Sequence, residues 1–439
     1  MPDGETFDHS LVLPDRSTVK AWVVCVTASL FFFFEFVQMM MFNAINPSLM
    51  REFHITATSV GMISSAYFLA NIIFMFPAGI LLDRFSTRKI IIVAMFLCVG
   101  GTLVFSLSTN IYMAAFARFL TGVGGSFPFL CCLRLCSRWF PARRWALVTG
   151  VVVTVAFLGG AFGQAPMTIL VEHFGWRDAL RVDAFLGVLF IGLIYLNVQD
   201  CPENFRGIIF EKAKSVKFLP AIKTTLKNIQ NWFYGLYTSM LNLSVMVLGA
   251  IYGSLYLVQV HGLSATDASF VTSMIFFGTM VGSPLIGYIS DKMGLRKAPM
   301  ILFAVLSIGL LIAIMYLPNL SIKELMVLFF LLGFLTSSQV ISYPAISESN
   351  KHELSGSALG WASVLIMGAP ALFQPLFGWM LDLGWNGKMI NHVPQYSLTD
   401  FRTAFWVLPI TGIVGLVMVL LAKETYARST VKRQSNKAA

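Results

Sequence analysis

Long apolar runs alternate with short polar breaks along the whole chain. Each run has the roughly 20 residues that a helix needs to cross a bilayer, and the breaks carry charged residues, Gly or Pro. This pattern predicts an all-α integral membrane protein. Twelve transmembrane helices are expected, over 21–48, 57–82, 89–108, 110–138, 144–170, 179–198, 233–260, 267–290, 298–317, 323–346, 355–382 and 402–422.

Composition supports this prediction. The chain is 57% hydrophobic and only 12% charged, whereas soluble domains are about 45–50% apolar. The first residues are acidic and polar, unlike the basic start of a cleaved signal peptide, so we expect the first helix to stay in the mature protein.

Lys and Arg residues are distributed unevenly over the predicted loops. Most lie in the two tails and in the loops after even-numbered helices, such as 83–89, 199–230 and 291–297. By the positive-inside rule, both termini are expected to be cytoplasmic. The net charge of +10 is thus explained by topology, and no nucleic-acid motif accompanies it. The compact loops favour a bacterial inner membrane.

The two halves of the chain repeat. "GILLDRFSTRK" at 79–89 returns as "GYISDKMGLRK" at 287–297, and Thr58 and Thr266 precede corresponding helices. A duplicated six-helix unit is therefore expected. The predicted division is an N-terminal tail at 1–20, a first bundle at 21–198, a linker at 199–232, a second bundle at 233–422 and a C-terminal tail at 423–439.

These motifs resemble those of the major facilitator superfamily. The loop signature of that family is matched here by Gly79, Leu81, Asp83, Arg84, Arg88 and Lys89, with departures at Ser86 and Thr87. A second signature, Arg-x-x-x-Gly-x-Gly, is matched by Arg118, Gly122 and Gly124. The resemblance implies two six-helix bundles that rock about a site near the membrane midplane.

The repeated loop charges are predicted to form a conformational latch. Asp83, at a helix end, can accept hydrogen bonds from Arg88 or from a neighbouring helix, and so hold the halves together when the outside is open. Alternatively, these charges only mark the membrane edge. The expected latch residues are Gly79, Asp83, Arg84, Arg88, Gly287, Asp291, Lys292 and Arg296.

Glu35, in "FFFFEFVQMMM", is the one acid predicted to lie deep in a span. A charge at that depth costs about 3 kcal/mol on insertion scales and therefore needs a partner. Arg118 lies at a similar predicted depth, and the resemblance places both helices at the central cavity, where sugar porters oppose such an acid and arginine. We predict that Glu35 and Arg118 couple proton movement to transport. A static ion pair, or binding of a substrate amine by Glu35, are the alternatives.

Neutral polar residues within the predicted spans are expected to line a substrate cavity. Such groups suit a small polar solute, although each can instead bond a neighbouring helix. The expected cavity residues are Gln38, Asn46, Tyr67, Asn71, Asn242, Tyr252, Tyr256, Gln339 and Tyr343.

The function predicted from these features is proton-coupled import of a small polar solute such as a metabolite, peptide, organic acid or carboxylate siderophore. A drug or metabolite efflux antiporter is the alternative, but Gln164 interrupts the helix 5 signature of that group. A non-transporting receptor is a third reading. No P-loop, nucleophile elbow or metal-ligand spacing is present, so we expect no enzyme, no metal and no cofactor, with the proton gradient as energy source. A monomer is expected.

Overall fold

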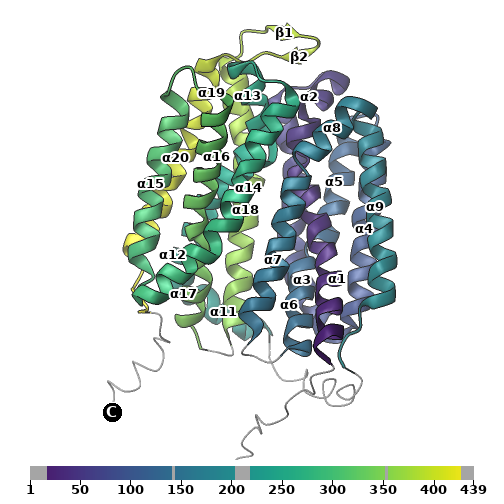
Figure 1. Ribbon diagram of the computed structural model, residues 1–439, viewed down its shortest axis with the longest axis vertical. Helices are drawn as coiled ribbons and strands as arrows, with labels where there is room; N and C mark the ends of the chain where they lie inside the picture. Colours follow the sequence, from purple (N-terminus) through teal and green to yellow (C-terminus); the bar gives the residue numbers. More distant parts are fainter. Residues whose placement is uncertain (1–16, 141–143, 203–217, 352–353, 427–439) are drawn as a thin grey trace, which may run out of the picture.

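The computed structural model describes residues 17–140, 144–202, 218–351 and 354–426. Within them, twelve helical segments are long and apolar enough to cross a membrane, which confirms the predicted all-α membrane fold. The helices run along the long axis, with α1 beginning and α20 ending at the same end (Figure 1). We call this the terminal end and the opposite one the far end.

The first half contains nine helices among the described residues. Several spans are built of two pieces, and a proline in the first turn opens the second piece at α6 and α8, where its missing N–H leaves no bond unmade. The helices are α1 (Ser17–Met40), α2 (Phe42–Phe53), α3 (Ala57–Arg84), α4 (Thr87–Ser106), α5 (Ile111–Gly125), α6 (Pro128–Trp139), α7 (Trp145–Phe162), α8 (Ala165–Phe174) and α9 (Trp176–Asn197).

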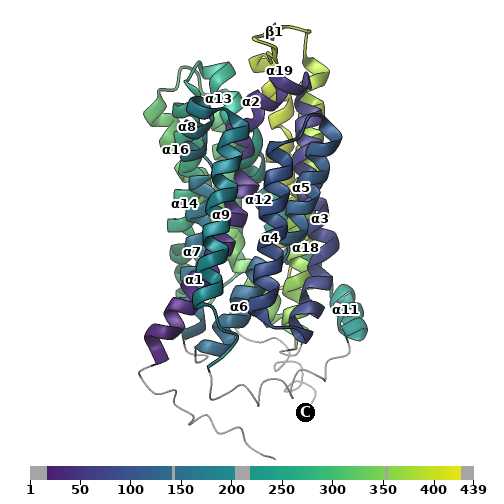
Figure 2. The same cartoon turned by 90° about the vertical axis from the view of Figure 1, so that its right-hand side faces the viewer.

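The second half follows a linker helix that lies at the terminal end beside the bundle (Figure 2). The elements are α11 (Phe218–Lys227), α12 (Ile229–Ser244), η4 (Val245–Tyr252), α13 (Gly253–His261), α14 (Ala265–Met293), α15 (Lys297–Tyr316), α16 (Ile322–Thr336), η5 (Ser337–Ile341), α17 (Ser342–Glu348), α18 (Ser355–Gly384), α19 (Leu398–Phe405) and α20 (Val407–Leu421). A short antiparallel hairpin of β1 (Met389–Ile390) and β2 (Val393–Pro394) caps the far end.

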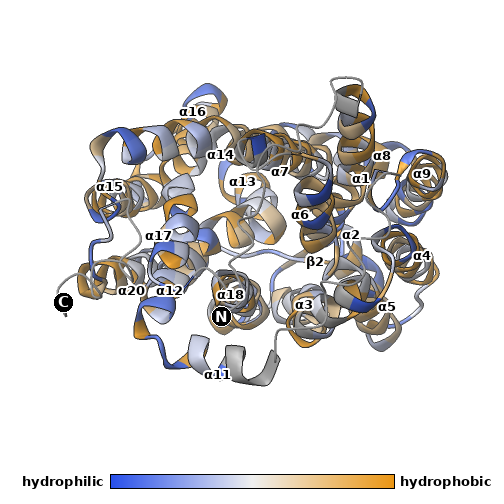
Figure 3. Ribbon diagram, turned by 90° about the horizontal axis from the view of Figure 1, so that it is seen from below, coloured by the Kyte–Doolittle hydropathy of each residue, from blue (hydrophilic) through white to orange (hydrophobic). Residues whose placement is uncertain are grey.

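The two halves lie side by side when seen from the terminal end (Figure 3). They meet where α3 packs along α18 and where α7 packs along α14. Large apolar side chains such as Phe96, Phe185 and Val305 are exposed on the outer helices, whereas amides and hydroxyls such as Gln38 and Asn46 are buried. This arrangement suits a lipid surround, because only the interior offers hydrogen-bond partners to polar groups.

Candidate functional site

A cluster of polar side chains is buried inside the first half. Arg118 on α5 is fully buried, and its guanidinium lies between two aromatic rings, 4.9 Å from the centre of Phe42 and 4.7 Å from that of Tyr67. Gly122, one turn later, makes this possible. A Cβ there would lie 2.2 Å from the carbonyl oxygen of Tyr67, so glycine lets α5 close onto α3.

Glu35 on α1 lies in the same cluster and is bonded to Tyr67. The Tyr67 hydroxyl donates a hydrogen bond of 3.0 Å to the Glu35 carboxylate, which is 4% exposed. The expected direct ion pair between Glu35 and Arg118 is not formed in this conformation. The physical reason is that Tyr67 contacts both groups. Its hydroxyl hydrogen-bonds the Glu35 carboxylate, and its ring face makes a cation–π contact with the Arg118 guanidinium.

The Arg118 guanidinium has no hydrogen-bond acceptor. All three of its nitrogens are buried and unpartnered. Contact with aromatic faces offsets part of the free-energy cost of removing a cation from water, by about 2 kcal/mol for a desolvated cation. Unmade hydrogen bonds to a buried charge still cost more than this. The site therefore holds a cation ready for an acceptor.

A second deep carboxylate, Asp183 on α9, corrects the prediction that Glu35 is the one deep acid. Asp183 is 3% exposed and accepts a hydrogen bond from the Gln38 amide. Gln38 in turn accepts a bond of 3.0 Å from Thr102 on α4. Asp183 was visible as a lone acid within the predicted span at 179–198, but only the packing of α9 shows that its side chain turns inward.

The far end is closed by hydrogen bonds between the halves. The η4 segment of the second half is a π-helix, and several of its carbonyls also accept side-chain hydrogen bonds from the first half. The carbonyl of Gly249 accepts a bond of 2.6 Å from Asn43 and another from Gln164, and that of Ile251 accepts one of 2.9 Å from Asn46. Every hydrogen bond that joins two described residues of opposite halves lies in this far-end region.

Two expected cavity residues belong to this closure. Asn46 reaches η4, and the Tyr252 hydroxyl donates to the carbonyl of Ala57 at 2.9 Å across the interface. Gln164, which interrupts the efflux signature, is also part of it. Its amide donates to the carbonyl of Gly249 in η4 and accepts a hydrogen bond of 2.8 Å from the Thr272 hydroxyl. The available signal was its place as a polar residue within the predicted span at 144–170.

The remaining cavity residues are placed differently. Asn71, one turn from Tyr67, is buried with neither amide atom bonded. Tyr256 donates to the carbonyl of Ile314 within the second half. Asn242 and Gln339 are 7% and 8% exposed, and Tyr343 is half-buried. Whether these last three meet a solute stays a prediction.

The latch segments lie at the terminal end, each bonded within its own half. Arg296 forms ion pairs with Asp291 at 2.5 Å and with Glu348 at 2.7 Å, tying α14 to α17. Burial opposes the charge of Arg296, but these two carboxylates outweigh it and raise the pKa of the guanidinium.

In the first half, the latch segment bonds the end of α9. Arg88 contacts Asp200 through its backbone amide, at 2.8 Å, and the carbonyl of Tyr195 through its guanidinium. Arg84 and Lys292 are exposed, Gly79 and Gly287 have open space around them, and the side chain of Asp83 lies outside the described part. The latch therefore stays a prediction.

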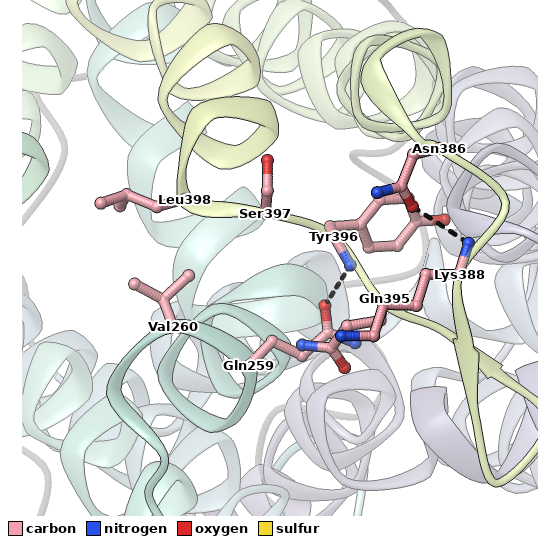
Figure 4. Close-up of a pocket in the computed structure, with 8 residues that line it drawn as sticks. All are labelled: Gln259, Val260, Asn386, Lys388, Gln395, Tyr396, Ser397 and Leu398. Atoms are coloured by element: carbon pink, nitrogen blue, oxygen red, sulfur yellow. Dashed lines mark hydrogen bonds between the residues drawn. The ribbon is translucent and has the colours of Figure 1, made fainter.

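A surface pocket of about 350 Å³ opens at the far end, within the second half (Figure 4). Gln259 forms part of the pocket wall. Its side-chain amide donates a hydrogen bond of 2.9 Å to the carbonyl of Pro394 and accepts one of 3.0 Å from the backbone N–H of Tyr396. The Gln259 amide groups thus hydrogen-bond the 386–398 loop and are not available to a ligand. The pocket is distant from the buried cluster of the first half, and we assign it no part in the site.

Comparison with known proteins identifies the class. The family model of the Major Facilitator Superfamily matches residues 28–264 and again 234–438, and the chain belongs to this superfamily of membrane transporters. It is 22% identical, over 88% of its length and 90% of the relative, to a probable hexose phosphate transport protein of Chlamydia muridarum. It is 24% identical to the membrane sensor protein UhpC of Salmonella typhimurium, covering 79% and 82% of the two chains. The fold matches a crystal structure of a D-xylose-proton symporter with a TM-score of 0.71 at 15% identity, over 93% of this chain and 99% of that one.

Proposed function

We propose that this protein is a proton-coupled secondary transporter that imports a small polar solute carrying an anionic group. The observation that carries the proposal is the buried Arg118 guanidinium, whose three nitrogens have no acceptor. A carboxylate or phosphate of a solute would supply charge-assisted hydrogen bonds in matching geometry. A relative described as a probable hexose phosphate transport protein is consistent with an anionic solute.

Glu35 is the proposed proton carrier. Its carboxylate is buried and takes one hydrogen bond, from Tyr67, rather than an ion pair with Arg118. An ionised carboxylate in such a place is costly, so a change in its surroundings moves its proton. Because Tyr67 contacts both Glu35 and Arg118, a solute that draws Arg118 away from the Tyr67 ring also changes the environment of Glu35.

The orientation follows from the distribution of Lys and Arg. With both termini in the cytoplasm of a bacterial cell, the closed far end faces outward. Rocking of the two halves would expose the cluster to each side of the membrane in turn, with solute and proton released to the cytoplasm.

The test is uptake into proteoliposomes with a pH dye inside. The panel would contain amino acids, dipeptides, organic acids, sugar phosphates and carboxylate siderophores. In Glu35→Gln we expect solute-dependent acidification to be lost while solute exchange survives. Asp178→Asn, which alters an exposed acid on α9, is the matched control. Wild-type proton movement in Glu35→Gln would refute the coupling role, and alkalinisation on uptake would indicate exchange instead.

A sensor is the second candidate, because one relative is described as a membrane sensor protein. The same proteoliposomes separate the two functions. A sensor would be stabilised against heating by a solute of the panel, yet would neither accumulate nor exchange that solute. Stabilisation together with uptake supports the transporter.

A further inference from the structure

Asp183 is a buried carboxylate that the proposed function does not use. Its Oδ2 accepts a hydrogen bond from the Gln38 amide, whereas its Oδ1 is buried without a partner. An ionised carboxylate with one hydrogen bond and no cation is far more costly in an apolar interior than the neutral acid.

No cation offsets the charge of Asp183 among the described residues that pack against α9. That helix packs against α1, α4 and α8. On α1 and α4 the titratable groups nearest to Asp183 are Glu35 and the thiol of Cys98, and neither is positively charged. Arg118 lies on α5 and forms no hydrogen bond with Asp183, because all three of its nitrogens are unpartnered.

The charged groups of α8 and of α9 itself do not change this picture. Glu172 on α8 is exposed at the far end and bonded to Thr266. Arg177 and Arg181, on α9, are paired at 2.7 Å with Glu52 and at 2.6 Å with Asp178. The surroundings of Asp183 thus favour its neutral form.

The hydrogen bonds around Gln38 carry the inference further. The hydroxyl of Thr102 has one proton but faces two acceptors, the carbonyl of Cys98 at 2.9 Å and the Gln38 Oε1 at 3.0 Å. Only one of the two can therefore receive the Thr102 proton when the Gln38 amide nitrogen points to Asp183. The oxygen and nitrogen of an amide are assigned from such networks, so the opposite orientation has to be considered.

With the Gln38 amide turned over, every link of the chain has one donor and one acceptor. Asp183 then donates to Gln38 Oε1, the Gln38 amide donates to Thr102, and Thr102 donates to the Cys98 carbonyl. This arrangement requires a proton on Asp183. When that proton leaves, the amide turns back and the direction of the chain reverses.

We propose that Asp183 is a second proton-binding site. The Gln38 amide, one turn after Glu35 on α1, changes its orientation when Asp183 gains or loses its proton. The protonation of Asp183 does not depend on the proposed function. A part for Asp183 in proton coupling does rest on that function. Two carboxylates on adjoining helices would then take up protons when the far end opens.

The direct test is infrared spectroscopy of the purified, solute-free protein. We expect the carbonyl stretch of a protonated carboxylic acid near neutral pH, present in Glu35→Gln and lost when Asp183→Asn is added to Glu35→Gln, so that Glu35 contributes to neither spectrum. If the double variant does not fold, Thr102→Val in the Glu35→Gln background should shift the same band by breaking the chain. A band unchanged by Asp183→Asn in that background, or by Thr102→Val when only that variant folds, would overturn the proposal.

Transport gives a second readout, once a solute has been found. Asp183→Asn should move one proton fewer per solute than wild type, and Asp183→Glu should restore the ratio. If Glu35→Gln leaves transport coupled while the Asp183 band persists, the proposed function fails and the Asp183 site survives. If the band is absent but Glu35→Gln uncouples transport, the reverse holds.

Discussion

Asp382, in the last turn of α18, accepts two hydrogen bonds from Thr58 at the start of α3 in the other half, one from the backbone amide at 3.0 Å and one from the hydroxyl. The symmetric contact also exists. The hydroxyl of Thr266, at the start of α14, donates a hydrogen bond of 2.6 Å to the carboxylate of Glu172, near the end of α8. The duplicated threonines therefore each meet an acid from the opposite half. Together the two contacts close the far end with pseudo-twofold symmetry.

Asp382→Ala should open the far end. The N-cap of α3, Thr56, makes no side-chain cap, so Asp382 serves the exposed N–H groups and positive end of this helix from the other half. Losing these bonds, about 1–2 kcal/mol, should shift the equilibrium toward the far-end-open state by about five- to thirtyfold. Spin-label distances between the far ends of the two halves would measure it. Unchanged distance distributions would count against a closing role.

Tyr396 belongs to the same closure. Its hydroxyl donates a hydrogen bond of 2.6 Å to the Asp382 carboxylate and accepts one of 3.0 Å from the backbone N–H of Ala57. Burial, and then the bond to Asp382, raise the pKa of Tyr396, so the hydroxyl keeps its proton as the pH rises. Tyr396→Phe should therefore open the far end in the same direction as Asp382→Ala, without adding a pH dependence below the titration of tyrosine. A new pH dependence at neutral pH would contradict this.

Arg118→Lys should weaken binding of an anionic solute. Lysine keeps the charge but loses the planar set of donors, and hydrogen bonds to charged groups are worth about 1.5–3 kcal/mol. We expect KM for the anionic solute to rise about ten- to hundredfold. A neutral analogue of the same solute is the control, and an equal loss for both would indicate damage to the helix packing instead.

Tyr67→Phe should separate the two contacts that Tyr67 makes. The ring that carries Arg118 is kept, whereas the hydroxyl that favours ionised Glu35 is removed. The pH at which uptake falls by half should therefore move upward, with little change in solute affinity. Uptake measured across a pH series would show it, and an unchanged profile would exclude this hydroxyl from coupling.

Gly253→Ala should destabilise the π-helical segment. A Cβ at Gly253 would lie 2.0 Å from the carbonyl oxygen of Leu248, which accepts a bond from Asn43. Relief of this overlap should cost about 1–3 kcal/mol and disturb the far-end closure. Thermal unfolding of Gly253→Ala would be compared with Gly309→Ala, where the space around the glycine is open. Equal melting temperatures would show that η4 adapts without loss.

The sequence by itself determined the twelve helices, because a backbone in lipid must satisfy its own hydrogen bonds and a long apolar run has few other ways to do so. It also identified the two charges that demand explanation, Glu35 and Arg118, since any charge within such a run stands out. These are local properties of a segment and can be read from neighbouring residues.

Tertiary structure decided which groups meet. Helical spacing shows that Glu35 and Gln38 share a face of α1, but the rotation of α9 and α3 decides that Asp183 meets Gln38 and that Tyr67 stands between Glu35 and Arg118. The π-helical carbonyls that receive Asn43 and Gln164 are likewise invisible in the sequence. Such contacts depend on many small packing differences between helices, and no single segment contains them.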